Sequence, residues 1–142
     1  MYTYSVAKFA NSTLKLSMFF AMLIAASAAL PNQASAQRMA GSDIRKAVGG
    51  HKLVLSVMGV QLPIAYRANG TMKGSMASYV ASMAGESKSS DTGKWLIKDG
   101  RLCQRWNNWL DGKSYCFTLS GKGNTINWSA SNGYSGTARI VR

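Results

Sequence analysis

Few residues of this chain could carry out acid–base, nucleophilic or metal chemistry. The 142 residues include one histidine, His51, and five acids against 17 lysines and arginines. A lone histidine cannot build a metal site, and no motif places a nucleophile beside it. A glycosidase needs two facing carboxylates, but the acids are scattered: Asp43, Glu86, Asp91, Asp99 and Asp111. We therefore predict a protein that is not an enzyme and has no cofactor or metal, with a hydrolase using His51 as the weakest alternative.

The two cysteines form the clearest chemical pair. Cys103 and Cys116 are separated by twelve residues, a spacing that matches neither a zinc motif nor a redox motif. An even pair of cysteines in an exported chain is typical of a structural disulfide. We predict that Cys103 and Cys116 are bonded to each other.

Basic and aromatic residues near the cysteines are the candidate contacts for a ligand. The set consists of Trp109, Trp106, Arg105, Arg101 and Lys113. Trp109 lies in a polar loop, where aromatic side chains often mark recognition sites. We therefore predict that it is exposed. For Trp106, at a strand end, core and contact roles both stay open.

Residues 1–36 have the pattern of a cleaved secretory signal peptide. Lys8 and Lys15 precede an uncharged, mostly apolar run over 16–26, and the segment ends in Ala34-Ser35-Ala36. An uncleaved anchor is the alternative, but the run is shorter than the roughly 20 residues that span a bilayer. We expect a single domain over 37–142, periplasmic or secreted, without a stable membrane span. Its 15 basic residues and five acids leave a net charge of +10.

Turn signals and short apolar runs predict the fold. Four Asn-Gly or Asp-Gly pairs, which favour tight hairpin turns, begin at residues 69, 99, 111 and 132. We predict an all-β, mainly antiparallel meander of about eight strands, forming a small barrel or sandwich. One short helix should precede it, capped by Ser42, with Asp43 at its positive end and Gly49-Gly50 at its close. The expected strands are 53–58, 63–67, 71–80, 95–98, 102–106, 114–119, 125–130 and 137–141.

The turn at Asp99-Gly100 and the cysteine pair predict one register. Lys98 then pairs with Arg101, and Cys103 with Cys116, while a pair of Trp106 with Lys113 ends the second hairpin. Side chains alternate between the faces of a sheet, so the disulfide should share the solvated face with Leu96, Arg105 and Thr118. The opposite face should hold Trp95, Ile97, Leu102, Trp106, Tyr115, Phe117 and Leu119.

The segment Gly93-Lys94-Trp95 with Leu102-Cys103-Gln104-Arg105-Trp106 and Cys116 resembles a family of small exported proteobacterial proteins of alphaproteobacterial type. The family pattern is Gly-x-Trp, then Leu-Cys-x-x-Trp, then a second Cys, and residues 66–71 also fit it. The function of that family is unknown. The resemblance implies an envelope protein with a β-rich fold, and it brings no catalytic residues.

The leading functional hypothesis is a non-enzymatic binding module for anionic or glycan envelope components. The partner would be an anionic polymer, a glycan or a lipid headgroup, which the positive charge attracts over long range. Nucleic acid also suits the charge, but export argues against it. The alternative is a calycin-like carrier of a small apolar ligand, with a lining of Met58, Met72, Met76 and Met83.

Overall fold

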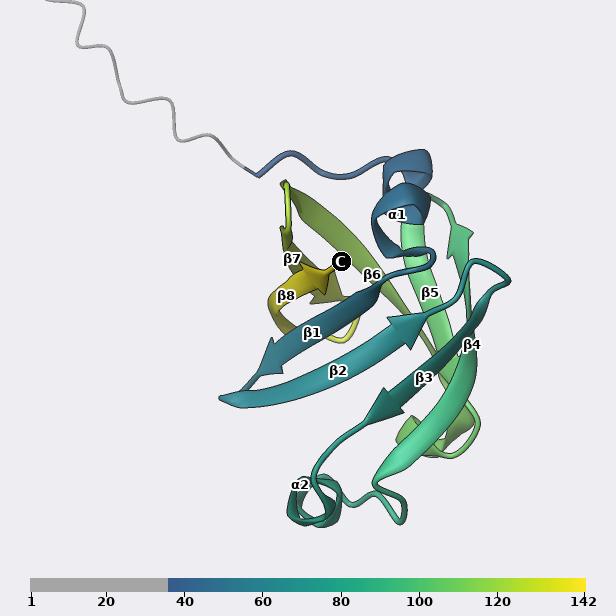
Figure 1. The fold of residues 1–142 in the computed structure, drawn as a ribbon, viewed down its shortest axis with the longest axis vertical. Helices are drawn as coiled ribbons and strands as arrows, with labels where there is room; N and C mark the ends of the chain where they lie inside the picture. Colours follow the sequence, from purple (N-terminus) through teal and green to yellow (C-terminus); the bar gives the residue numbers. More distant parts are fainter. Residues whose placement is uncertain (1–35) are drawn as a thin grey trace, which may run out of the picture. The chain divides into compact units, whose positions relative to one another are not determined.

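The computed structural model describes residues 36–142, which form a closed antiparallel barrel in which each strand pairs with the next and β1 with β8 (Figure 1). The predicted fold class is confirmed, and the architecture is a barrel. The predicted signal peptide, residues 1–35 of it, lies outside the described residues. The strands are β1 (Lys52–Val57), β2 (Val60–Tyr66), β3 (Thr71–Ser75), β4 (Ser90–Lys98), β5 (Arg101–Trp106), β6 (Ser114–Lys122), β7 (Thr125–Ala130) and β8 (Ser135–Val141).

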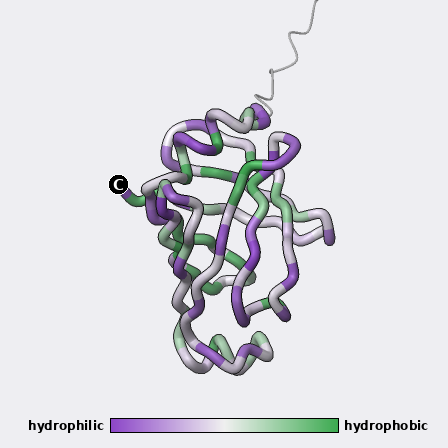
Figure 2. The backbone as a smooth tube through the Cα atoms, turned by 90° about the vertical axis from the view of Figure 1, so that its right-hand side faces the viewer, coloured by the Kyte–Doolittle hydropathy of each residue, from purple (hydrophilic) through white to green (hydrophobic). Residues whose placement is uncertain are grey.

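Alternation of side chains decides which face of the wall looks inward. In β7, Ile126 and Trp128 are buried, whereas Thr125, Asn127 and Ser129 are exposed. Hydrophilic and hydrophobic stretches accordingly alternate along the chain in Figure 2. The apolar set thereby reaches the barrel interior and the polar set reaches solvent.

The helix α1 (Gly41–Val48) covers one end of the barrel, and its Ile44 and Val48 are fully buried. It ends at Gly49, as predicted, but Ser42 does not cap it. The chain enters the helix two residues earlier, so that Ala40 occupies the cap position and Ser42 lies inside the first turn. No helix of the described residues is long and apolar enough to cross a membrane.

The segment between β3 and β4 differs from the prediction of one strand over 71–80. The β3 strand ends at Ser75, and residues Ser78–Met83 form the short helix α2. The backbone N–H of Met76 donates to the carbonyl of Ser89 at 2.8 Å. This bond closes the β3–β4 ladder, so the chain leaves the wall at Met76 and returns to it in β4, at the end of the barrel opposite α1 (Figure 1).

The barrel interior is filled by side chains. The space among its inward residues is a cavity of about 20 Å³, room for a single water molecule. The hydroxyl of Tyr66 donates to Oε1 of Gln104 at 3.0 Å inside the wall, and burial raises the pKa of Tyr66 above its usual range. A ligand-binding cavity measures roughly 300–1,000 Å³, so this interior offers a carrier no room for a ligand.

The methionines proposed as a lining for a carrier do not gather in the interior. Met58 and Met83 are 91% and 82% exposed, because both lie in connections outside the wall. Met72 is buried in the core, and Met76 packs against the core from its edge.

Trp109 closes the barrel end opposite α1. It begins η1 (Trp109–Gly112), a short kinked turn between β5 and β6, and its indole lies 4.8 Å from that of Trp106 between ring centroids. Both indoles occupy the space beside Gly74 of β3. A Cβ atom there would lie 2.6 Å from Cζ3 of Trp109 and 2.8 Å from Cη2 of Trp106.

We therefore expect Gly74→Ala to lower the free energy of unfolding by about 1–3 kcal/mol, the usual cost of overpacking a core. Urea unfolding monitored by tryptophan fluorescence measures it. Ser75→Ala, at the next and exposed position of β3, should change the free energy by less than about 0.5 kcal/mol. Equal stability of Gly74→Ala and the wild type would contradict this account of the barrel end.

Candidate anion-binding groove on the barrel wall

The register of β4, β5 and β6 sets the outward face of the wall. The pairs Lys98–Arg101 and Cys103–Cys116 form as predicted, and the two cysteines are joined by a disulfide. The ladder stops at Arg105–Ser114, one pair short of the predicted end at Trp106–Lys113. The chain turns into the η1 loop at this point.

The two tryptophans proposed as ligand contacts are core residues. Trp109 is 2% exposed and Trp106 is 3% exposed, so the prediction that Trp109 is an exposed contact is wrong. The Trp109 Nε1–H donates to the carbonyl of Lys88 at 2.8 Å, which satisfies the polar edge of the indole after burial. The contact role left open for Trp106 is excluded by the same burial.

The three cations of the predicted set stand on the surface in different surroundings. Arg101 lies 3.9 Å from the carboxylate of Asp99, and Lys113 lies 3.3 Å from that of Asp111. Arg105 is exposed, and its Nε donates to the carbonyl of Gly112 at 2.8 Å. Arg105 is thus the member of the set that, among the described residues, has no carboxylate within ion-pair distance.

A groove of about 310 Å³ runs along the outer side of β3 and β4. Thr71 and Lys73 face outward from β3, and Thr92 and Lys94 face outward from β4. Its lining also includes residues from the β2–β3 turn and from the segment that follows β5. The lining residues are Arg67, Asn69, Thr71, Met72, Lys73, Thr92, Gly93, Lys94 and Asn107.

The electrostatics of this groove favour an anion. Within the described part of the chain, Arg67, Lys73 and Lys94 have no ion-pair partner, and no acid lines the groove. Lys94 stands directly opposite Arg105 in the ladder, and like charges at such a pair repel. A bound carboxylate, sulfate or phosphate would relieve this repulsion and accept hydrogen bonds from the lysine and arginine side chains.

Asp91 positions one rim of the groove. Its carboxylate accepts hydrogen bonds from the backbone N–H groups of Asn108 and Trp109 and from the Asn108 amide, at 2.7–2.8 Å. The neighbouring Asn107 then reaches back to the hydroxyl of Thr92 at 3.0 Å. Burial alone would raise the pKa of Asp91, but these hydrogen bonds outweigh it and lower the pKa below its usual value.

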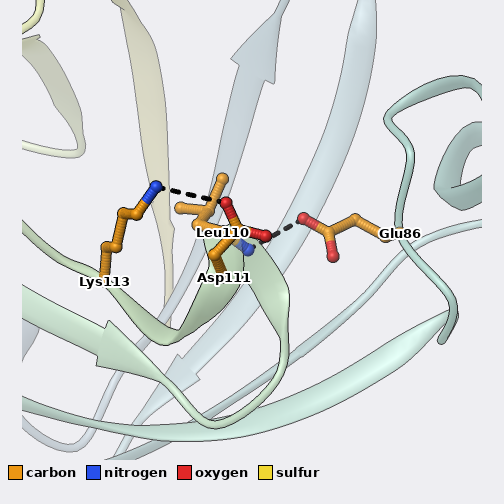
Figure 3. A network of polar contacts seen from close by, with 4 residues as sticks. All are labelled: Glu86, Leu110, Asp111 and Lys113. Atoms are coloured by element: carbon orange, nitrogen blue, oxygen red, sulfur yellow. Dashed lines mark hydrogen bonds and ion pairs between the residues drawn. The ribbon is translucent and has the colours of Figure 1, made fainter.

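A second acid supports the same loop. The backbone N–H of Leu110 donates to Oε1 of Glu86 at 2.9 Å, while Lys113 pairs with Asp111 (Figure 3). Leu110 and Asp111 both have left-handed backbone angles, with φ of 55° and 54°. The carboxylate of Glu86 therefore helps to hold a backbone conformation that L residues rarely adopt.

Sequence reasoning missed all three cations that line the groove. Arg67, Lys73 and Lys94 were not in the candidate set, and Arg105 borders the groove as the neighbour of Lys94. Their signal in the sequence was the alternation of outward positions in β3 and β4. The prediction of β3 as a strand over 71–80 hid that signal, because it left the pairing of β3 with β4 undefined.

His51 directly precedes β1. Its Nδ1 is buried and has no hydrogen-bond partner in the described part of the chain.

Comparison with family models, with curated proteins and with solved structures finds no match for this chain. The resemblance to small exported proteins therefore stays a prediction.

The lowered pKa of Asp91 predicts how stability depends on pH. The carboxylate stabilises the fold fully above its unfolded-state pKa, and this contribution is lost as the pH falls through the lower folded-state pKa. We expect Asp91→Ala to reduce the free energy of unfolding by about 3–5 kcal/mol at pH 7. The difference from wild type should shrink as the pH falls below 4, as measured by urea unfolding from pH 7 to pH 2.

Asp111→Asn is the matched control. Asp111 is exposed, and asparagine tolerates the left-handed conformation at this position. Its removal should leave the pH profile of stability close to that of the wild type. A constant difference between Asp91→Ala and wild type down to pH 2 would contradict the role assigned to the Asp91 carboxylate.

Proposed function

We propose that the protein is a non-enzymatic binding module for anionic or glycan components of the cell envelope, which it engages at the groove on its wall. The observation that carries the proposal is a groove of about 310 Å³ with three cations and no acid in its lining. Four hydroxyl or amide side chains, from Asn69, Thr71, Thr92 and Asn107, line the groove beside these cations and supply hydrogen-bonding groups for a polyhydroxylated or acidic sugar.

The exported location belongs to the same proposal. Residues just after the proposed cleavage position are bonded to the barrel, since the carbonyl of Gln37 accepts a bond from the Gly121 N–H at 3.3 Å. The Met39 N–H then donates to Leu119 at 2.9 Å. These bonds support a chain that folds as residues 37–142, and the disulfide suits an oxidising compartment.

The filled interior favours surface binding over the carrier alternative. A cavity of about 20 Å³ lies far below the several hundred Å³ that a small apolar ligand occupies. The size of an acidic ligand on the outer wall is not limited by the volume of the groove, because a polymer can extend past both ends of it. The proposal is therefore restricted to ligands held on the outer wall.

Neutralising the groove should weaken binding of purified lipopolysaccharide, whose phosphates supply the anions. We expect a variant with Arg67→Gln, Lys73→Gln and Lys94→Gln to bind about 100-fold more weakly at low salt, at about 1 kcal/mol for each charge removed. Titration calorimetry with wild type and variant measures the change, and the difference should diminish as salt screens the charges.

The matched control carries Lys46→Gln, Lys122→Gln and Arg139→Gln, exposed positions outside the groove. It has the same net charge as the groove variant, so it should keep binding within a few-fold of the wild type. Equal weakening of both variants would show attraction by net charge alone and would refute the groove. The groove would also be refuted if neither an acidic polysaccharide nor lipopolysaccharide binds the wild type at low salt.

A further inference from the structure

Exposed apolar side chains are concentrated at the barrel end opposite α1. In an up-and-down barrel, alternate connections emerge at the same end, and the four connections at this end are β1–β2, β3–β4, β5–β6 and β7–β8 (Figure 1). Each of them displays at least one large apolar or aromatic residue. Five of the seven such exposed residues in the described chain lie here, and they are Met58, Tyr79, Met83, Leu110 and Tyr134.

Two of these residues occupy backbone conformations that disfavour them. Met58 and Leu110 have φ of 49° and 55°, in the left-handed region where glycine or asparagine is usual. Met58 is 91% exposed and Leu110 is 42% exposed. Packing of these side chains inside the fold therefore does little to offset the strain of the left-handed backbone. A contact outside the molecule accounts for large apolar side chains at these turn positions.

The acids at this end are already bonded within the fold, while Lys88 of the β3–β4 connection donates to the Asn108 side chain at 3.1 Å. Asp91 is buried and hydrogen-bonded, Glu86 accepts a bond from Leu110, and Asp111 pairs with Lys113. Most of the cations lie instead at the α1 end of the barrel or in the strand halves that lead to it. These are Arg38, Arg45, Lys46, Lys52, Arg67, Lys98, Arg101, Lys122, Arg139 and Arg142.

The loop-tip residues suit a lipid surface better than a protein surface. They are distributed over four separate connections, whereas a stable protein interface needs about 800 Å² of continuous, complementary surface on each partner. A bilayer interface imposes no such shape. Tyr79 and Tyr134, which are 70% and 63% exposed, belong to the residue types enriched where membrane meets water.

We propose that the end of the barrel opposite α1 docks onto a lipid bilayer, with Met58, Tyr79, Met83, Leu110 and Tyr134 entering the boundary between headgroups and acyl chains. Docking is driven by apolar contact and does not require anionic lipid. The cationic α1 end then points away from the bilayer. This inference is independent of the groove, because it rests on different residues and on a different force.

Sedimentation with phosphatidylcholine vesicles in 0.5 M NaCl tests the docking, since salt at this concentration suppresses attraction by charge. We expect the wild type to bind, and Tyr79→Ser with Met83→Ser to lower the partition coefficient by about 10- to 100-fold. Both residues are exposed on α2, whose buried residue is Ala81, so the variant should fold. Leu96→Ser is the control, because Leu96 is an apolar residue that is 53% exposed on the wall, away from the loop tips. This substitution should leave vesicle binding unchanged.

Met58→Asn separates docking from stability. Asparagine relieves the left-handed conformation, so the urea midpoint should rise, while loss of the apolar tip should weaken vesicle binding severalfold. Absence of wild-type binding in 0.5 M NaCl would overturn the proposal. So would equal loss in Leu96→Ser, unchanged binding in both loop-tip variants, or a wild-type dimer that dissociates in the Tyr79→Ser, Met83→Ser variant. Failure of lipopolysaccharide to bind the groove would leave this result unaffected.

Discussion

The interior of an eight-stranded barrel is just wide enough for side chains to fill it, and filling it organises this molecule. The indoles of Trp95, Trp106, Trp109 and Trp128 are all buried in one core. α1 covers one end of that core, while Trp109 closes the other beside Gly74. Only about 20 Å³ stays open inside, far less than the roughly 300–1,000 Å³ of a small-molecule site.

Burial of Trp109 also links the core to the groove. The carboxylate of Asp91 accepts the backbone N–H groups of Asn108 and Trp109, which turns the indole into the barrel end. The same turn brings Asn107 against Thr92 at the rim of the groove. One buried acid therefore shapes both the packed end of the barrel and part of the proposed binding surface, and the disulfide ties the two strands that carry the loop.

The outer surface separates two kinds of interaction. The groove on β3 and β4 is lined by cations and by no acid, and the connections opposite α1 carry exposed apolar side chains. Charge attraction acts over long range and fades with salt, whereas apolar contact is short-ranged and proportional to buried area. A protein with both surfaces can engage an anionic polymer on its side and a lipid surface at its tip without competition between them.

Local features of the sequence determined most of the strands, most turns and the pairing of Cys103 with Cys116, because alternation and Asn/Asp-Gly turns act within a few residues. The exception is 71–80, where β3 ends at Ser75 and α2 follows. The local features also put Arg105 correctly on the outer face. They could not predict that Trp109 is buried. Its burial depends on Asp91, 18 residues away, and on the space beside Gly74, where any larger residue would clash with the indole. Nor could they assemble the groove. Its cations come from separate strands and turns, and only closure of the barrel, with β3 paired to β4, brings them together.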